Sequence, residues 1–265
     1  MGRITRQFWS QFRTWERPAQ IGFALVALML PIVLIALVFG PFSLRTPALI
    51  GLFGLIVVGQ VIFMWANRGM VSVYTRAQRL YLDEEFEAAC ALLEEWRATG
   101  KANMRSLTLL GNAYRQRGLL DQSEAVLLEA LNISPNHHYP LYGFGRTLLI
   151  QGRYVEAVQK IEQALEAGAP AVVRLDAAEA HYRSGEPAAT SELIETILPE
   201  LTEPHRLLMG RYLLYRTGRG QAPEAALVAE GLDYWRVHAE RYAHTPYGQA
   251  LADDVRAMVS MVQET

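Results

Sequence analysis

The stretch that decides the fold is MRSLTLLGNAYRQRGLLDQSEAVLLEALNISPN, residues 104–136. Gly118 divides it into two apolar-rich runs, and a glycine is favoured where a helix must end and turn. Small residues at Gly111, Ser123 and Ala130 would let two helix backbones approach, while larger side chains fill the gaps between them. The stretch therefore predicts one unit of two antiparallel helices joined by a turn.

The same pattern returns along the chain at a spacing of 34 residues, which is the signature of a repeat architecture. The small sites of the successive first and second helices are Ala77, Gly111, Gly145, Ala89, Ser123 and Ala157. We expect repeats over 70–244, with units at about 70–103, 104–137, 138–170 and 171–203 and a degenerate unit at 204–238. Because one unit cannot bury its apolar face alone, the units should stack into an α-solenoid.

The unit at 104–137 resembles a tetratricopeptide repeat. The positions that carry the resemblance are Leu107, Leu110, Gly111, Tyr114, Gly118, Ser123, Leu127, Ala130 and Pro135. The resemblance implies an all-α fold of helix-turn-helix repeats, and it implies that residues of the first helices line a groove that binds a peptide or another protein.

The end of the chain reads as a C-terminal capping helix over 245–265. Thr245 is a favourable N-cap, and Pro246 suits the first helical position. The following residues, LADDVRAMVSMV, can cover the last apolar face of the stack and leave a polar outer side.

Two blocks near the start, residues 21–40 and 48–66, contain no Asp, Glu, Lys or Arg. A bilayer core needs roughly 20 residues of helix, so each block matches one membrane crossing. Buried core helices would keep a polar face, and the apolar region of a signal peptide is shorter, so both alternatives are disfavoured. The seven-residue link PFSLRTP predicts an antiparallel transmembrane hairpin over 21–66, with Pro31 kinking its first helix.

Arginine placement predicts the orientation of this hairpin, because positive residues stay on the cytoplasmic side. Arginines precede the first block and follow the second, whereas Arg45 alone lies in the link. We expect both termini in the cytoplasm and a two-span protein of a bacterial inner membrane or plasma membrane. Residues 1–20 predict an interfacial amphipathic segment, because Phe8, Phe12 and Trp15 recur at helical spacing among arginines.

The candidate partner-binding residues follow from the offsets of the first helices. They are Tyr74, Gln78, Tyr81, Arg105, Thr108, Asn112, Arg115, Tyr139, Tyr142, Arg146, Leu149, Leu175, Glu179, Tyr182 and Arg183. Tyr and Arg are enriched where binding energy concentrates, and the arginines favour an acidic ligand. The alternative is that these are solvated residues and that partners bind elsewhere.

No nucleotide-binding, metalloprotease or serine-hydrolase motif occurs, and His137 and His138 lack further partners at metal-ligand spacing. We therefore expect no catalytic residue, no cofactor and no metal. A net charge of −2 argues against nucleic acid as a partner. The predicted function is a membrane-anchored, non-catalytic scaffold or adaptor that binds proteins or peptides at the cytoplasmic face. The alternative is an accessory subunit of a larger membrane complex whose hairpin forms part of the interface.

Overall fold

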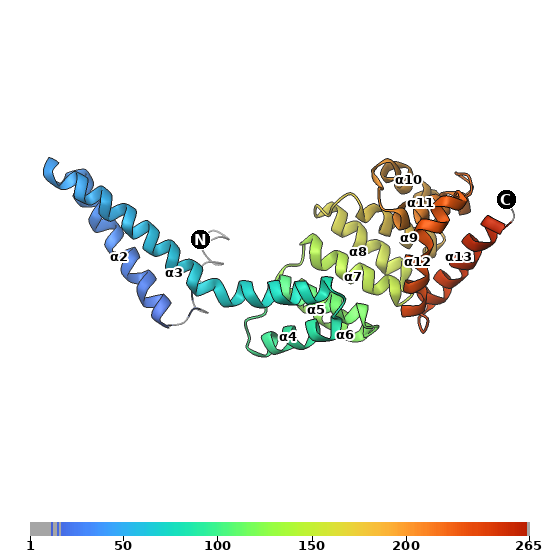
Figure 1. The fold of residues 1–265 in the computed structure, drawn as a ribbon, viewed down its shortest axis with the longest axis horizontal. Coiled ribbons are helices and arrows are strands. Elements are labelled where there is room, and N and C mark those ends of the chain that lie inside the picture. Colours follow the sequence, from blue (N-terminus) through green and yellow to red (C-terminus); the bar gives the residue numbers. More distant parts are fainter. Residues whose placement is uncertain (1–11, 13–14, 16, 264–265) are drawn as a thin grey trace. The chain divides into compact units, whose positions relative to one another are not determined.

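The computed structural model describes residues 12, 15 and 17–263, and this part of the chain is helical without any strand (Figure 1). The predicted all-α class, with an apolar N-terminal helix pair before a solenoid of helical repeats, is confirmed. Contacts divide the chain into two compact units, Met1–Arg76 and Ala77–Thr265.

The first unit holds α2 (Arg17–Phe39) and most of α3 (Phe42–Leu82). Only Gly40 and Pro41 separate the two helices, so the link is shorter than the predicted seven residues. Gly40 and Pro41 provide the chain reversal, and the residues after them contain no further break strong enough to prevent helix formation. Pro31 lies inside α2, which continues through it.

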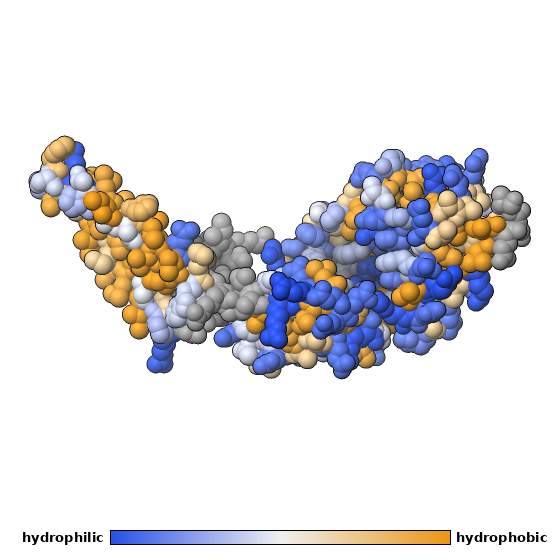
Figure 2. All heavy atoms as spheres, in the orientation of Figure 1, coloured by the Kyte–Doolittle hydropathy of each residue, from blue (hydrophilic) through white to orange (hydrophobic). Residues whose placement is uncertain are grey.

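Helices α2 and α3 pack closely at two glycines. A Cβ atom added at Gly22 would lie 3.1 Å from the Ile62 side chain, and one at Gly59 would lie 3.2 Å from Val26. Both helices are long and apolar enough to cross a membrane, over Arg17–Phe39 and Phe42–Ala66. Their large apolar side chains are mostly exposed, and Figure 2 shows this apolar surface gathered over the helix pair.

Most of the predicted interfacial segment, residues 1–11, 13–14 and 16, lies outside the described residues. Within the described part, Trp15 is buried and its ring contacts Phe23 and Phe63 at centroid distances of 5.4 and 5.6 Å. The Gln20 amide donates to the carbonyl oxygens of Phe12 and Trp15. These contacts hold Trp15, just before α2, against both α2 and α3.

The second unit continues from the end of α3 as a series of antiparallel helices, each packed on the next in the chain. They are α4 (Phe86–Ala98), α5 (Met104–Gln116), α6 (Leu120–Ile133), α7 (His138–Ile150), α8 (Tyr154–Glu166), α9 (Val173–Ser184), α10 (Pro187–Ile197), the 3-10 helix η1 (Leu198–Glu200), α11 (Pro204–Arg216), α12 (Ala225–Arg241) and α13 (Pro246–Gln263).

The small sites predicted from the 34-residue period lie at the contacts between helices. A Cβ atom added at Gly111 would lie 2.5 Å from Leu127 Cγ, and one at Gly145 would lie 2.6 Å from Ile161 Cγ1. The Ser123 hydroxyl is fully buried and donates to the Gly111 carbonyl at 2.7 Å. Any larger residue at these positions would push the paired helices apart.

The turns inside the units depend on left-handed backbone. Gly118 and Gly152 end the first helices of two successive units with φ angles of 73° and 81°. A residue with a Cβ atom adopts this conformation only at a cost, so glycine is favoured at both places. These two glycines are 34 residues apart, so the turn recurs at the period of the repeat.

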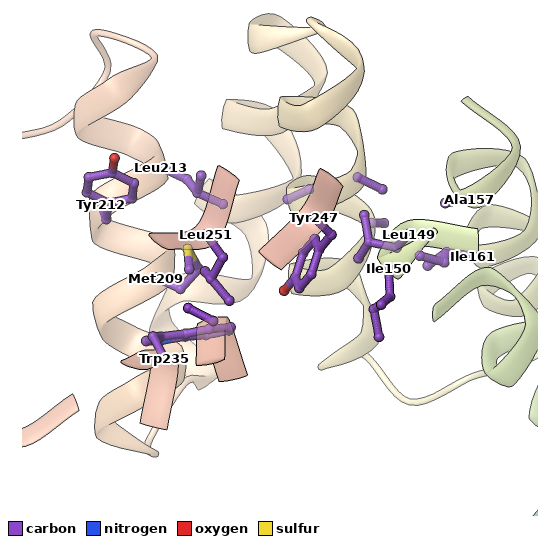
Figure 3. Packing of buried hydrophobic residues seen from close by; sticks show 14 of the residues in the cluster. Leu149, Ile150, Ala157, Ile161, Met209, Tyr212, Leu213, Trp235, Tyr247 and Leu251 are labelled. Atoms are coloured by element: carbon purple, nitrogen blue, oxygen red, sulfur yellow. The ribbon is translucent and has the colours of Figure 1, made fainter. Parts of the chain in front are cut away.

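The last helix does more than cover the neighbouring unit. Helix α13 starts at Pro246, and the Thr245 side-chain oxygen accepts from the Gly248 amide at 3.0 Å as an N-cap. It packs against α12, its chain neighbour, and also against α7. Figure 3 shows Tyr247 and Leu251 of α13 lying between Met209 of α11 and Leu149 of α7. A simple stack, in which each unit contacts only its neighbours, does not describe this end of the chain.

Candidate functional site

The candidate partner-binding residues, named here the first-helix surface, differ in their exposure. Gln78 and Arg105 are exposed. Arg115 is buried, as are Thr108, Leu149, Leu175 and Glu179. The members of intermediate exposure are Tyr74, Tyr81, Asn112, Tyr139, Tyr142, Arg146, Tyr182 and Arg183, although the side chain of Arg183 itself is buried. Choosing residues by their position in the repeat therefore gave some that face solvent and others that face neighbouring helices.

One cluster joins α7 to α9 through Asp176. The Tyr142 hydroxyl donates to Asp176 Oδ2 at 2.7 Å, and Arg146 forms an ion pair with Asp176 Oδ1. Burial raises the pKa of Tyr142, and the Asp176 carboxylate raises it further. Burial alone would lower the pKa of Arg146, but the charge of Asp176 together with Tyr142, Tyr247 and Glu179 outweighs this effect and raises the pKa. The two predicted side chains therefore bind an acid of the same protein.

A second cluster joins α9, α11 and α13. Arg183 Nη2 lies 2.6 Å from Asp254 Oδ2 and 3.4 Å from Glu179 Oε1, and all three side chains are at most 7% exposed. The Tyr212 hydroxyl donates to Asp254 Oδ1 at 2.8 Å and accepts from Arg216 at 3.1 Å. Such a buried pair is held in place because each charge has compensating partners.

Tyr247 is a second residue of α13 that contacts this cluster. Its side chain is fully buried, and the Arg183 guanidinium lies 5.5 Å from the centre of its ring. Burial and the Glu179 carboxylate raise the pKa of Tyr247 well above its ordinary value. Burial also raises the pKa of Glu179, although Arg183 and Arg146 oppose the change.

A third group lies at the C-terminal end of α5. Arg115 donates through Nη1 to Asn112 Oδ1 at 2.7 Å and to the Gly143 carbonyl at 3.2 Å. The Gln116 side chain accepts from Arg241 at 2.6 Å and from the Tyr242 hydroxyl at 3.2 Å. The end of α12 therefore reaches back to α5, 125 residues earlier in the chain.

Sequence reasoning named Tyr142, Arg146, Arg183 and Arg115 of these clusters. It missed the other members, Asp176, Asp254, Tyr212, Arg216, Gln116, Arg241, Tyr242 and Tyr247. For Asp254 a signal was present in the sequence. Tyr247, Leu251, Asp254 and Met258 follow helical spacing, so the acid lies within the apolar stripe of the last helix. A carboxylate on an apolar stripe requires a cationic partner.

Chemically, these clusters position helices against one another by charge-assisted hydrogen bonds. Among the described residues, no group of three or more His, Cys, Asp or Glu side chains is placed to hold a metal ion. Cys90 is buried, and burial raises the pKa of its thiol, so the reactive thiolate form is disfavoured there.

An aromatic stack on α12 and α11 predicts acid sensitivity. The Tyr234 ring stacks on His205 and on His238, with both centroid distances 4.0 Å. Burial lowers the pKa of His238 to about 4, helped by the positive charges of Arg146, Arg241 and His205 and opposed by its hydrogen bond to the Tyr234 carbonyl.

The unfolded state, with a histidine pKa near 6.5, therefore binds more protons than the folded state between about pH 6.5 and 4. Stability should fall as the pH decreases through this window, and His238→Gln should remove part of that fall. The measurement is the urea midpoint of the wild type and the variant at pH 7.5 and 5. An equal loss of stability in both proteins would contradict the prediction.

The chain is similar to one repeat family and to several solved structures. The tetratricopeptide repeat family matches residues 105–137. No curated protein matches the chain. The solved structure named MamA MSR-1 C2 is 17% identical, with 69% of this chain and 96% of that chain covered and a TM-score of 0.46. A tetratricopeptide repeat protein from Parabacteroides merdae is 16% identical, with 78% and 87% covered and a TM-score of 0.49.

Proposed function

We propose that this chain, whose residues 105–137 match the tetratricopeptide repeat family, is a non-catalytic scaffold or adaptor anchored in a membrane, which binds other proteins or peptides. The proposal rests on one observation: the chain combines an exposed apolar helix pair with a second unit whose apolar residues are buried. The helix pair exposes large apolar side chains such as Ile21 and Phe53, at 62% and 71%, whereas the apolar residues of the repeats are largely buried. A soluble protein rarely exposes so continuous an apolar surface.

The partner would be a protein or peptide with acidic residues. Arg105 is exposed at a first-helix position, and arginine can bind a carboxylate through two parallel hydrogen bonds. We expect Arg105→Glu to reduce partner recovery when the full chain is purified from membranes in mild detergent. Lys101→Glu is the matched control, because it makes the same charge change in the loop before α5. Equal recovery with both variants would argue against this part of the surface.

In the proposed topology both termini are cytoplasmic and the turn at Gly40 and Pro41 lies on the opposite side, since arginines flank the outer ends of the two spans. Sealed vesicles of known orientation test this. Protease added at the cytoplasmic face should digest the second unit and leave a fragment of about the size of the helix pair. Protection of the second unit at that face would contradict the topology.

A second candidate function, an accessory subunit of a membrane complex, is favoured by one observation. Nothing lies within 4 Å of Cβ atoms added at Gly51 and Gly54 of α3, so another transmembrane helix could approach the backbone there. Replacing residues 17–66 by an unrelated two-span anchor separates the two functions. A scaffold keeps its partners after this exchange, whereas an accessory subunit loses them.

A further inference from the structure

The C-terminal helix α13 occupies part of the surface that the repeats would offer to a partner. Its buried side chains Tyr247, Leu251, Asp254, Val255 and Met258 lie on one face, at spacings of four, three, one and three residues. Its other face carries exposed Asp253 and Arg256, which pair with each other. The helix is therefore amphipathic, with a single carboxylate inside its apolar face.

The partners of this face come from the first helices of different units. Asp254 is bound by Arg183 of α9 at 2.6 Å and by Tyr212 of α11 at 2.8 Å. At the beginning of α13, Pro246 lies against Gly152, whose added Cβ atom would be 3.0 Å away. Tyr247 and Leu251 lie between Met209 of α11 and Leu149 of α7 (Figure 3). Helix α13, 18 residues long, thus contacts the three successive first helices α7, α9 and α11 in addition to its chain neighbour α12.

The docking of α13 contains imperfect contacts. Among the described atoms, Arg183 Nε is buried without a hydrogen-bond partner, beside the buried ion pair of Arg183 and Asp254. Unsatisfied buried polar atoms and a buried ion pair make a helix interface weaker than an apolar one of the same shape. Residues 242–245 join α13 to α12, on which it also packs, and α13 is the last described helix, so it can leave the surface of α7, α9 and α11 without unfolding those helices.

We propose that the surface formed by α7, α9 and α11 is a helix-binding site, that α13 is its resident ligand, and that a partner binds by replacing α13. The partner is an amphipathic helix that places one aromatic residue, two or three aliphatic residues and one carboxylate on a single face, in the spacing of Tyr247, Leu251, Asp254 and Met258. This inference rests on the proposed function, because it specifies the partner of the scaffold.

Hydrogen exchange of the full chain in detergent or nanodiscs tests whether α13 leaves the surface. We expect the α13 amides to exchange about tenfold faster than those of α7 and α8, because a local opening costs less than global unfolding. Asp254→Asn should increase exchange in α13 further, and α13 should remain faster than α7 and α8. Asp253→Asn, which alters the exposed neighbour, should leave exchange unchanged.

A labelled peptide of residues 244–263 tests the site itself. We expect it to bind the full-length Asp254→Asn variant about tenfold more tightly than the wild type, where resident α13 competes. A peptide carrying the same Asp254→Asn change should show no such gain. Met258→Ala provides a second chain variant that keeps the ion pair, and it should also take up the wild-type peptide more tightly than the wild-type chain does.

Two results would overturn the proposal. In the first, α13 exchanges only at the rate of α7 and α8 in the wild type. In the second, neither variant chain gains affinity for the peptide. Either result makes α13 a permanent part of the fold. Partner recovery from membranes would be unaffected by such a result, so failure of this inference is distinguishable from failure of the proposed scaffold function.

Discussion

Replacing Asp254 by alanine is expected to lower the free energy of unfolding of the second unit by about 3–5 kcal/mol, the range for breaking a buried ion pair by removing one partner. Arg183 is 5% exposed and would retain only Glu179, at 3.4 Å, as a nearby carboxylate. The Tyr212 hydroxyl would lose its acceptor as well. The cost therefore comes from the groups left behind rather than from the lost attraction alone.

The measurement is urea unfolding of the full chain in detergent or nanodiscs, followed by helical circular dichroism. Asp253→Ala is the matched control, because this neighbouring acid is exposed and pairs with Arg256 on the same helix. An exposed pair of this kind contributes about 0–1 kcal/mol. Equal effects of the two substitutions would show that Asp254 does not hold a buried charge in place.

A double replacement, Arg183→Leu with Asp254→Leu, separates charge compensation from packing. Removing both charges leaves no uncompensated ion, so the double variant should be more stable than Asp254→Ala alone. Glu179 would then lose its own cationic neighbour, and burial already raises its pKa. The remaining loss in the double variant should therefore be smallest at low pH, where this carboxyl is protonated.

The helical repeat could be predicted because its determinants are local. Gly111 and Leu127 meet within one unit, and Gly118 sets the turn between their helices. Each of these positions recurs at the same period, so one well-defined unit is enough to identify the next. Local sequence and global fold agree here, as expected of a sequence with consistent contacts at each level.

The environment of the candidate site could be predicted only in part, because it depends on contacts far apart in the sequence. Offsets correctly place Arg146 and Arg183 on first helices. They contain no information about α12 and α13, which return to bind Gln116 and Arg183. Such closure depends on the twist accumulated over the helices between these residues, and no short motif encodes that twist.

The bounds of the two apolar helices could also be predicted only in part. Composition identifies both apolar helices, since no charged residue occurs between 21–40 or 48–66. It does not fix their bounds, because PFSLRTP has turn-forming residues at both ends and the helix begins at Phe42 inside it. Pro47 lies inside α3 as its sixth residue, so the helix begins before this proline and not after it as the sequence suggested.

The second large effect is expected at Leu127. Its side chain is fully buried and contacts both Gly111 and Gly143 across helices α5, α6 and α7. Leu127→Ala should cost about 2–5 kcal/mol, because burial is lost and the surrounding helices cannot fully close the cavity. The neighbouring Leu128 is 43% exposed, so Leu128→Ala is the matched control and should cost under about 1 kcal/mol.

A double-mutant cycle with Gly111 makes this prediction specific to the close approach of the helices. Gly111→Ala alone should destabilise the unit, although alanine favours helix formation, because its Cβ atom would meet Leu127 Cγ at 2.5 Å. In the Leu127→Ala background that collision is absent, and the added methyl group fills part of the cavity. We expect a favourable interaction energy of about 1–3 kcal/mol from urea unfolding of the four proteins. Simple additivity would mean that the two residues do not share one packing site, and that the 34-residue period reflects helix length rather than close contact.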